Sequence, residues 1–336
     1  MAEAESCGQE FDSDMHSEAK RLNVKLGGSV ALDVALGPDR LQTMREDAEI
    51  FAGVAGSELD VERAYLGEGV TLSRTYAHAS AGFFMWFEQV TPENPFPSQL
   101  RNVEGGFGYD IMMQLNVPAG PAFGTGKDRL SIVRWLAKLL RLIHLPEVHI
   151  PIVSTGPFSQ ALSEEGPKFH PLELGRRSVL ISSRSVRTLS ADHLRWITDY
   201  WQAGFELVRK DRRLSLAMTA FDDGASTGDP ALYMLSMWSG LEALFSPFPS
   251  ELSFRLSSAI ATYLEPPGRT RYDMQKHIKK LYDVRSKIVH GVPKAFDISE
   301  PLIQTDALMR KVLRRAIESN AVPEPEELIR RMFGEI

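Results

Sequence analysis

The sequence Met274-Gln-Lys-His-Ile-Lys-Lys-Leu-Tyr-Asp-Val-Arg-Ser-Lys-Ile-Val-His-Gly291 has the residue spacing of a helix. Its apolar residues lie 4, 3 and 7 positions apart and therefore share one face: Met274, Ile278, Leu281 and Ile288. Arg285 fills the missing position in this apolar stripe. Gly291 ends the segment, because glycine adopts the left-handed conformation that terminates many helices. We therefore expect a helix from about Thr270 to His290, with an arginine that faces the core.

Three polar residues lie along one flank of this helix at intervals of four: Tyr282, Ser286 and His290. A separation of five residues puts Arg285 and His290 about 140° apart on an ideal helix. The two side chains can line one cleft only if the helix end bends His290 inward, or if two chains contribute.

The preceding apolar segment supplies a partner for the arginine. Between Ala231 and Phe245 the only charged residue is Glu242, within Trp238-Ser-Gly-Leu-Glu-Ala-Leu-Phe245. A carboxylate on so apolar a helix must be paired or neutralised. We therefore expect an ion pair between Glu242 and Arg285, bidentate if the geometry permits.

The same helix is basic. Between Gly268 and His290, seven Lys or Arg residues stand against two Asp residues, in a chain whose net charge is −6. A local excess of about five positive charges can hold a phosphate backbone. The alternative is an ordinary solvated helix face. The lysines that we expect to contact RNA are Lys276, Lys279, Lys280 and Lys287.

Cleaving RNA without a metal ion needs few groups. A general base takes the proton of the 2′-hydroxyl, a general acid protonates the leaving 5′-oxygen, and a cation stabilises the charged phosphorane. Histidine suits the proton transfer because its ordinary pKa is about 6.5. Arginine suits the phosphate because its planar fork donates several hydrogen bonds and stays charged.

The motif Arg285-x4-His290 before Gly291, together with the Trp238–Phe245 helix, resembles the HEPN superfamily, and its ApeA-like branch in particular. The resemblance covers about residues 190–336. It implies a helical bundle, usually a homodimer, in which two R-x4-6-H motifs meet at the interface. It also implies a metal-independent endoribonuclease of toxin–antitoxin, CRISPR or phage-defence systems. Arg285 would bind the scissile phosphate and His290 would transfer protons, with Glu242, Ser286 and Tyr282 in supporting positions.

Two departures from the family pattern stand out. Many members have Asn directly after the Arg, where this chain has Ser286, which can still donate a hydrogen bond to a phosphate. ApeA-like proteins are longer, so the N-terminal part of this chain is expected to be a different or reduced sensor module. The resemblance suggests transfer RNA as substrate, defence by growth arrest as role, and a phage trigger or an antitoxin as a further partner.

Structural interpretations stand beside the catalytic one. Glu242 and Arg285 can form a buried ion pair that only joins two helices. His290 can simply satisfy carbonyl groups at a helix C-terminus. The alternative function is then a non-catalytic HEPN dimerisation or RNA-binding module. A nucleotide-binding regulatory protein is a third alternative.

Upstream of this region the pattern changes from helical spacing to alternation. We expect an acidic disordered tail over 1–20, a mixed β-rich recognition domain over 21–188 and the helical bundle over 189–336, an α+β protein overall. Predicted strands cover 22–36 as a hairpin, 70–78, 111–117, 148–153 and 179–183, with one helix at 128–143. Predicted helices cover 191–211 with Ser190 as N-cap, 229–245, 250–264, 270–290, 301–319 and 325–333.

Composition restricts the class of protein. The only cysteine among 336 residues is Cys7, which excludes a disulfide framework and a cysteine zinc site and favours a reducing, cytoplasmic location. No signal peptide and no membrane span are predicted. We expect neither a cofactor nor a bound metal.

Three further patterns are interpreted as structural. The segment 121–128 resembles a phosphate-binding loop, but Pro121 and Asp128 replace residues that such a loop requires. The histidines at 144, 149 and 170 lack metal-ligand spacing and are expected at surface or turn positions. Arg134, Lys138 and Arg141 share a helix face that we expect to be solvated.

Overall fold

The computed structural model describes residues 49–87, 98–144, 146–161, 163, 166–173, 176, 178–179, 188–245, 252–291 and 297–334, with only the backbone at 80–87, 98–107 and 252. Residues Glu46–Ile336 group into one compact unit. The predicted tail at 1–20, the hairpin at 22–36 and most of the run 179–183 lie outside the described residues.

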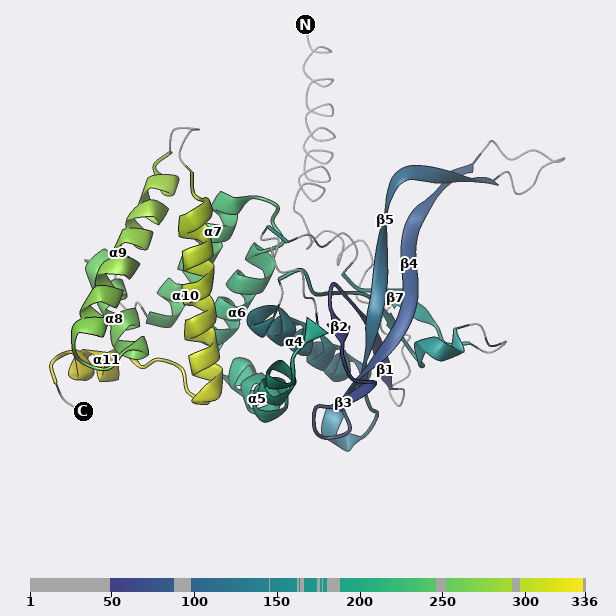
Figure 1. Ribbon diagram of the computed structural model, residues 1–336, viewed down its shortest axis with the longest axis horizontal. Helices are drawn as coiled ribbons and strands as arrows, with labels where there is room; N and C mark the ends of the chain where they lie inside the picture. Colours follow the sequence, from purple (N-terminus) through teal and green to yellow (C-terminus); the bar gives the residue numbers. More distant parts are fainter. Residues whose placement is uncertain are drawn as a thin grey trace, which may run out of the picture. The chain divides into compact units, whose positions relative to one another are not determined.

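The described chain combines an antiparallel sheet with a set of helices, which confirms the α+β class (Figure 1). The strands are β1 (Ile50–Ala55), β2 (Glu58–Leu59), β3 (Arg63–Tyr65), β4 (Thr71–Phe87), β5 (Ser98–Val117), β6 (His149–Ser154), β7 (Phe169–Pro171) and β8 (Thr188–Leu189). The helices are α4 (Gly126–Ile143), α5 (Ala191–Lys210), α6 (Arg212–Gly224), α7 (Pro230–Phe245), α8 (Leu252–Leu264), α9 (Arg269–Val289), α10 (Ser299–Glu318) and α11 (Pro325–Met332), with 3-10 turns η1 (Pro121–Phe123) and η2 (Phe158–Gln160).

The main sheet has the order β3-β4-β5-β1-β6-β7, and all its pairings are antiparallel. β1 lies at its centre, between β5 and β6, although the sequence did not predict this strand. Its residues read Ile-Phe-Ala-Gly-Val-Ala, and five of the six are buried. A strand covered on both faces lacks the alternation of apolar and polar residues by which strands are recognised. β2 and β8 form a separate short parallel pair.

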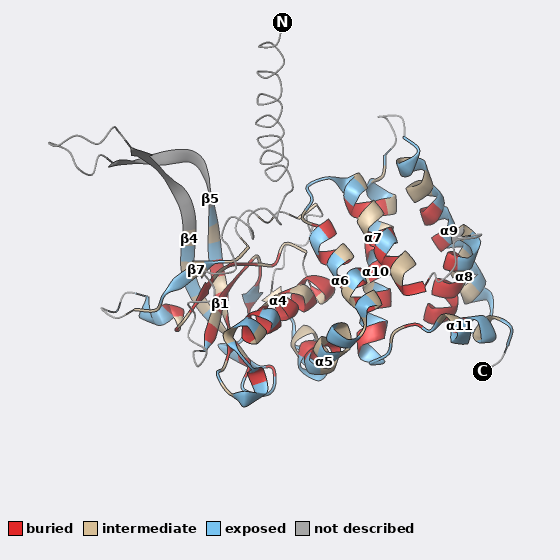
Figure 2. Cartoon of the chain, turned by 180° about the vertical axis from the view of Figure 1, so that it is seen from behind, coloured by how far each residue is buried: buried red, intermediate tan, exposed pale blue. Residues whose placement is uncertain are grey.

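Helix α4 joins the sheet to the other helices. It contacts β1 and β5 as well as α5, α6 and α10, and buried positions run through it into the facing helices (Figure 2). The indole Nε1 of Trp135 on α4 donates to the backbone oxygen of Trp201 on α5, at 2.8 Å. The guanidinium of Arg310 on α10 donates to the backbone oxygen of Leu142 at 2.8 Å. Whether 21–188 and 189–336 fold as separate domains stays a prediction.

The helices begin and end close to the predicted limits where capping signals mark them. Ser190 is the N-cap of α5, and its hydroxyl accepts from the backbone N–H of His193 at 3.3 Å. α9 ends before Gly291, whose φ is +81°. One helix was missed, because α6 follows α5 without a loop. Asp211 is both the C-cap of α5 and the N-cap of α6, and it accepts from the backbone N–H of Arg213 at 2.7 Å.

The helical core is centred on α7. This helix buries residues on most of its circumference, so its sequence shows little amphipathic pattern. Trp238 is fully buried. Gly240 allows the neighbouring helices to approach, because an added Cβ would lie 2.8 Å from Met309 Cε and 3.2 Å from Ala217 Cα. α7 is therefore a fixed support for Glu242.

Candidate functional site

The ion pair expected between Glu242 and Arg285 is present. Arg285 Nη2 on α9 lies 3.2 Å from Glu242 Oε1 on α7. The contact involves one nitrogen and one oxygen, so the fork is not bidentate. The side chains of Arg285 and Glu242 are 23% and 22% exposed, so the pair is only partly buried. The Arg285 side chain therefore keeps partial access to solvent.

Tyr282 completes the cluster around Glu242. Its hydroxyl donates to Glu242 Oε1 at 3.3 Å, and its ring lies 5.5 Å from the Arg285 guanidinium carbon. Trp238 packs edge-on against the same ring, with centroids 5.1 Å apart. Burial and the neighbouring carboxylate raise the pKa of Tyr282. The phenol therefore stays protonated at neutral pH and serves as a hydrogen-bond donor that orients Glu242.

Arg285 keeps unused donors. Its Nε is buried and has no hydrogen-bond partner among the described residues. Buried guanidinium nitrogens normally have a partner, from protein, water or ligand. With one nitrogen bound to Glu242 and the side chain partly exposed, the remaining donors suit an oxyanion such as a phosphate.

His290 is the C-cap residue of α9. Its backbone N–H donates to the carbonyl oxygens of Ser286 and Lys287, at 3.2 Å each, and its side chain is exposed. Because α9 is helical through Val289, the position of His290 relative to Arg285 follows helical spacing. His290 and Arg285 consequently remain on different sides of α9, and one chain does not bring the two together. Ser286, between them, is half-buried.

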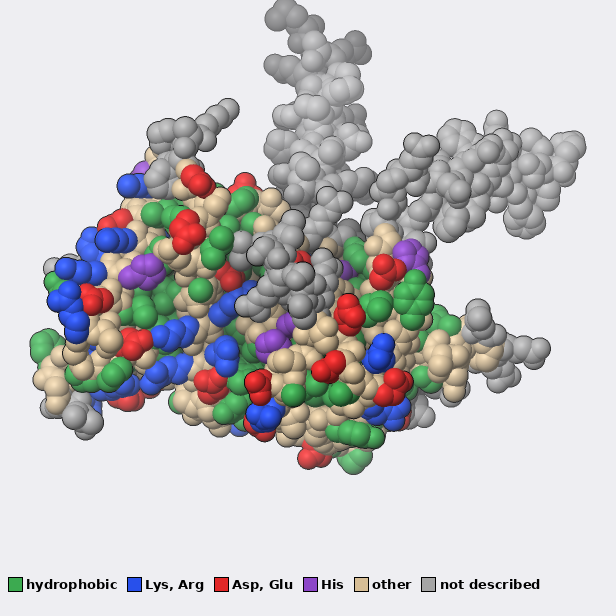
Figure 3. All heavy atoms as spheres, viewed as in Figure 1, with side chains coloured by type: hydrophobic (Ala, Val, Ile, Leu, Met, Phe, Trp, Pro, Cys, Tyr) green, Lys and Arg blue, Asp and Glu red, His purple; other side chains and the backbone are tan. Residues whose placement is uncertain are grey.

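The four candidate RNA-binding lysines are exposed on α9, where basic side chains gather (Figure 3). Members of this set have local contacts. Lys279 pairs with Asp283 at 3.1 Å, and Lys276 Nζ lies 4.4 Å from the centre of the Tyr272 ring. Lys280 and Lys287 complete the set. The local charge available for a phosphate backbone is therefore smaller than the sequence count, although surface pairs of this kind exchange readily.

A buried charged cluster centred on Arg141 was not predicted from the sequence. This residue is 2% exposed, which corrects the expectation that its helix face is solvated. Its Nη1 donates to both carboxylate oxygens of Asp222, at 2.9 and 3.1 Å, and its Nε donates to the Val148 carbonyl at 2.6 Å. Its Nη2 donates to Glu173. Arg176 Nη2 also reaches Asp222, at 2.9 Å.

The pKa values in this cluster favour the charged forms. Burial by itself would lower the pKa of Arg141, but Asp222 and Glu173 raise it above its ordinary value. Burial would raise the pKa of Asp222, but Arg141 and Arg176 hold it below 3.8. Because the cluster is largely sealed from solvent and joins α4, α6 and the segment after β7, its role is structural.

The expectation of surface or turn positions for the histidines holds only in part, because His144 lies in the turn after α4 but is buried. His144 is 8% exposed, and its Nε2 lies 3.0 Å from the Ser57 hydroxyl. It is therefore a buried partner and not a surface residue. His149 is half-buried, and burial lowers its pKa. Within the described part of the chain, no group of three or more His, Cys, Asp or Glu residues is placed to hold a metal ion.

None of the helices in the described ranges is both long and apolar enough to cross a membrane. Comparisons with protein-family models, curated proteins and solved structures find no match to this chain. The resemblance to HEPN proteins therefore rests on the residues of the motif and on their placement.

Proposed function

We propose that this chain is a metal-independent endoribonuclease of the HEPN type, acting in phage defence or in a toxin-like growth arrest. The observation that carries the proposal is the partial exposure of Arg285 together with its contacts. Its side chain is partly exposed, one of its nitrogens contacts Glu242, and its guanidinium carbon lies 5.5 Å from the ring of Tyr282, whose hydroxyl donates to the same carboxylate. Arg285 also lies little more than one helical turn before a solvent-exposed histidine. RNA, with transfer RNA as the first candidate, is the proposed substrate.

In the proposed mechanism Arg285 binds the non-bridging oxygens of the scissile phosphate. His290 transfers the proton, either from the 2′-hydroxyl or to the leaving 5′-oxygen. The 2′-oxygen attacks the phosphorus, the bond to the 5′-oxygen breaks, and the products are a 2′,3′-cyclic phosphate and a free 5′-hydroxyl. Electrostatic stabilisation by a preorganised cation and general acid–base transfer are the two contributions required.

The proposed active unit contains two chains. Arg285 faces α7, whereas His290 lies on the side of α9 that also carries Tyr272, Lys276 and Lys279, according to helical spacing. A two-fold axis near the ends of the two α9 helices would bring the Arg285 of one protomer toward the His290 of its partner. The exposed Val289, at 51%, lies between these residues and suits such an interface.

Mixed dimers test this arrangement. Arg285→Ala and His290→Ala homodimers should each be inactive. A heterodimer of the two, purified with different tags, should regain about half of the parent activity, because one composite site contains both intact residues. Light scattering should give twice the chain mass of 37.5 kDa for the parent protein. An inactive heterodimer, or a parent protein that is monomeric at micromolar concentration, would contradict the composite site.

Two substitutions separate chemistry from structure in the Glu242–Arg285 pair. Arg285→Lys keeps the charge but loses the planar fork, so cleavage should fall by about 100-fold with little change in melting temperature. Glu242→Gln should lower the free energy of unfolding by about 1–2 kcal/mol, between the values of exposed and fully buried pairs. Its activity should fall too, because Arg285 loses its anchor.

A thermal melt and a cleavage assay on both variants provide the measurements. The matched control is Arg269→Lys, which makes the same change on the same helix, at a surface residue that contacts Asp273 at 2.9 Å and the Tyr272 ring at 5.6 Å. This control should retain parent activity and stability. Full activity of Arg285→Lys would show that Arg285 is structural.

The pairing of Arg285 with Glu242 supports a second candidate function. If the guanidinium only joins α7 to α9, the helices form a non-catalytic dimerisation or RNA-binding module. RNA binding should then survive Arg285→Lys, and no cleavage should be detected in the parent protein. The same assays, read together with a gel-shift measurement, distinguish the two functions.

A further inference from the structure

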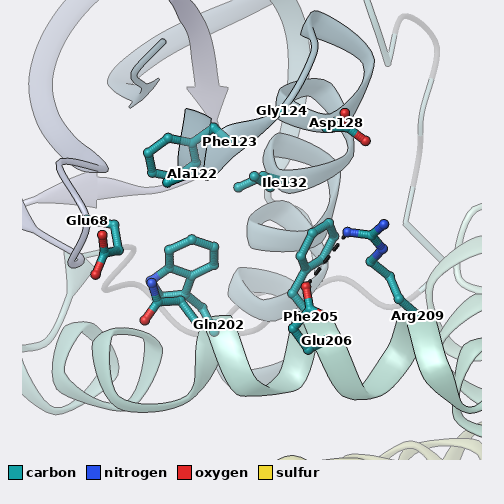
Figure 4. Close-up of a pocket in the computed structure, with 11 residues that line it drawn as sticks. Glu68, Ala122, Phe123, Gly124, Asp128, Ile132, Gln202, Phe205, Glu206 and Arg209 are labelled. Carbon is teal, nitrogen blue, oxygen red and sulfur yellow. Dashed lines mark ion pairs between the residues drawn. The ribbon is translucent and has the colours of Figure 1, made fainter. Parts of the chain in front are cut away.

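A second site lies between the turn after β3, the start of α4 and the length of α5. Here the chain forms a cavity of about 450 Å³ that is open to solvent on one side, and this volume lies within the range of small-molecule pockets. None of its lining residues belongs to α7 or α9. Figure 4 shows Glu68 at one end and Arg209 at the other, with aromatic and aliphatic side chains between them.

The walls of the cavity are aromatic and held in place. Phe123 comes from η1, and Trp201 and Phe205 come from α5. Trp201 Nε1 donates to the Leu66 carbonyl at 2.6 Å, and the Trp201 carbonyl accepts from Trp135 Nε1 at 2.8 Å. The Phe205 ring already makes a cation–π contact, because the Arg209 guanidinium carbon lies 5.5 Å from its centre. Aromatic rings fixed in this way suit a flat or cationic ligand without prior rearrangement.

The charges around the cavity are unequal. Three carboxylates, those of Glu68, Asp128 and Glu206, line it together with a single cation, Arg209. Two of the carboxylates are engaged. Asp128 accepts from the backbone N–H and the hydroxyl of Thr125, at 2.9 Å each, and these bonds lower its pKa. Glu206 pairs with Arg209 at 3.7 Å.

These contacts occupy the groups that would attract an anion. The positive end of α4 is capped by Thr125, with the Asp128 carboxylate completing the capping box, and Arg209 contacts Glu206 and Phe205. The Glu68 carboxylate, by contrast, has no hydrogen bond or ion pair within the described ranges. The uncompensated charge in the cavity is therefore negative, and it stands beside Trp201.

Glu68 also occupies an unusual backbone conformation. Its φ is +50°, between Gly67 at +94° and Gly69 at +82°. Glycine or asparagine fits this left-handed turn better than glutamate does. The turn is closed by the Leu66 N–H, which donates to the Val70 carbonyl at 2.9 Å. The chain thus places a carboxylate at the cavity in spite of local strain, a combination typical of functional positions.

We propose that this cavity binds a small organic cation. The ammonium group of the ligand would lie against Glu68, and its aromatic or aliphatic body would pack on Phe123, Trp201 and Phe205. An amine of this size matches both the charge and the volume of the cavity. The proposal is independent of the ribonuclease function and of the residues that carry it.

Three probes with one phenyl-ethyl body test the charge preference: phenethylammonium, neutral 2-phenylethanol and anionic 3-phenylpropanoate. Calorimetry and tryptophan fluorescence on the full chain should show saturable binding of phenethylammonium. It should bind about tenfold more tightly than the alcohol, which corresponds to about 1.4 kcal/mol. The propanoate should bind more weakly than either.

Variants then locate the site. Glu68→Gln should weaken phenethylammonium binding about tenfold, and Glu68→Asn, which tolerates the left-handed turn, should do the same. The matched control Glu62→Gln makes the same change on an exposed residue that does not line the cavity, and should bind as the parent does. The proposal would be overturned if phenethylammonium shows no saturable binding, if the alcohol binds equally tightly, or if the propanoate binds more tightly. It would also be overturned if Glu68→Gln and Glu62→Gln lose the same affinity for phenethylammonium.

Discussion

His290→Ala is expected to reduce RNA cleavage by at least 100-fold, and by up to about 10⁴-fold, while the protein melts at the parent temperature. General acid–base transfer contributes a factor of this size. Stability should not change, because the His290 side chain is exposed and only its backbone N–H closes the end of α9. The measurement is a cleavage time course on total transfer RNA in the presence of EDTA, with the product ends identified.

A neighbouring histidine provides the control. His277 is exposed on the same helix but lies outside the motif, so His277→Ala should cleave as the parent does. Products of the parent enzyme should carry a 2′,3′-cyclic phosphate or its hydrolysed form. Parent-level cleavage by His290→Ala would end the catalytic assignment, and so would a requirement for added magnesium.

Asp222→Asn is expected to destabilise the fold by about 3–5 kcal/mol, because it leaves buried cations without their main counter-charge. Arg141 would keep Glu173 as its only carboxylate partner among the described residues, and Arg176 would lose its ion pair with Asp222. For a unit of this size the loss corresponds to a fall in melting temperature of roughly 10 °C. Denaturant unfolding and a thermal melt provide the measurements.

Surface carboxylates should behave differently. Asp283 pairs with Lys279 on the exposed side of α9, and its side chain is 50% exposed. Asp283→Asn should therefore change the free energy of unfolding by no more than about 0.5 kcal/mol. Equal decreases in the free energy of unfolding of Asp222→Asn and Asp283→Asn would contradict this prediction. They would show that burial does not determine how much the Arg141 cluster contributes to stability.

The difference in free energy of unfolding between the parent and Asp222→Asn should depend on pH, because Asp222 titrates and asparagine does not. Because the folded protein holds the pKa of Asp222 below 3.8, the unfolded chain takes up the proton first as the pH falls. The stability that Asp222 contributes is therefore complete above about pH 5 and is lost as the pH falls through the folded pKa. The difference between parent and variant should be full at pH 7 and should shrink below about pH 4. A difference that stays constant down to about pH 3 would contradict this assignment.

The sequence determined those elements whose signals are local. α9 was predicted from its apolar spacing and from Gly291, and α5 was predicted from the N-cap Ser190, because capping and periodicity depend only on nearby residues. The contact of Glu242 with Arg285 could be predicted as well. One carboxylate on an apolar helix and one arginine in an apolar stripe each require a partner, although 43 positions separate them in the chain.

Only the tertiary structure decided which charged residues are buried and which elements complete the sheet. Arg141 has the same spacing as a solvated helix position, and its burial depends on Asp222, 81 residues away. β1 carries no alternation because neighbours cover both of its faces, and α6 has no loop before it to mark its start. The cavity beside Glu68 combines three segments distant in sequence. Such features arise from packing between remote parts of the chain, and local residue patterns do not record that packing.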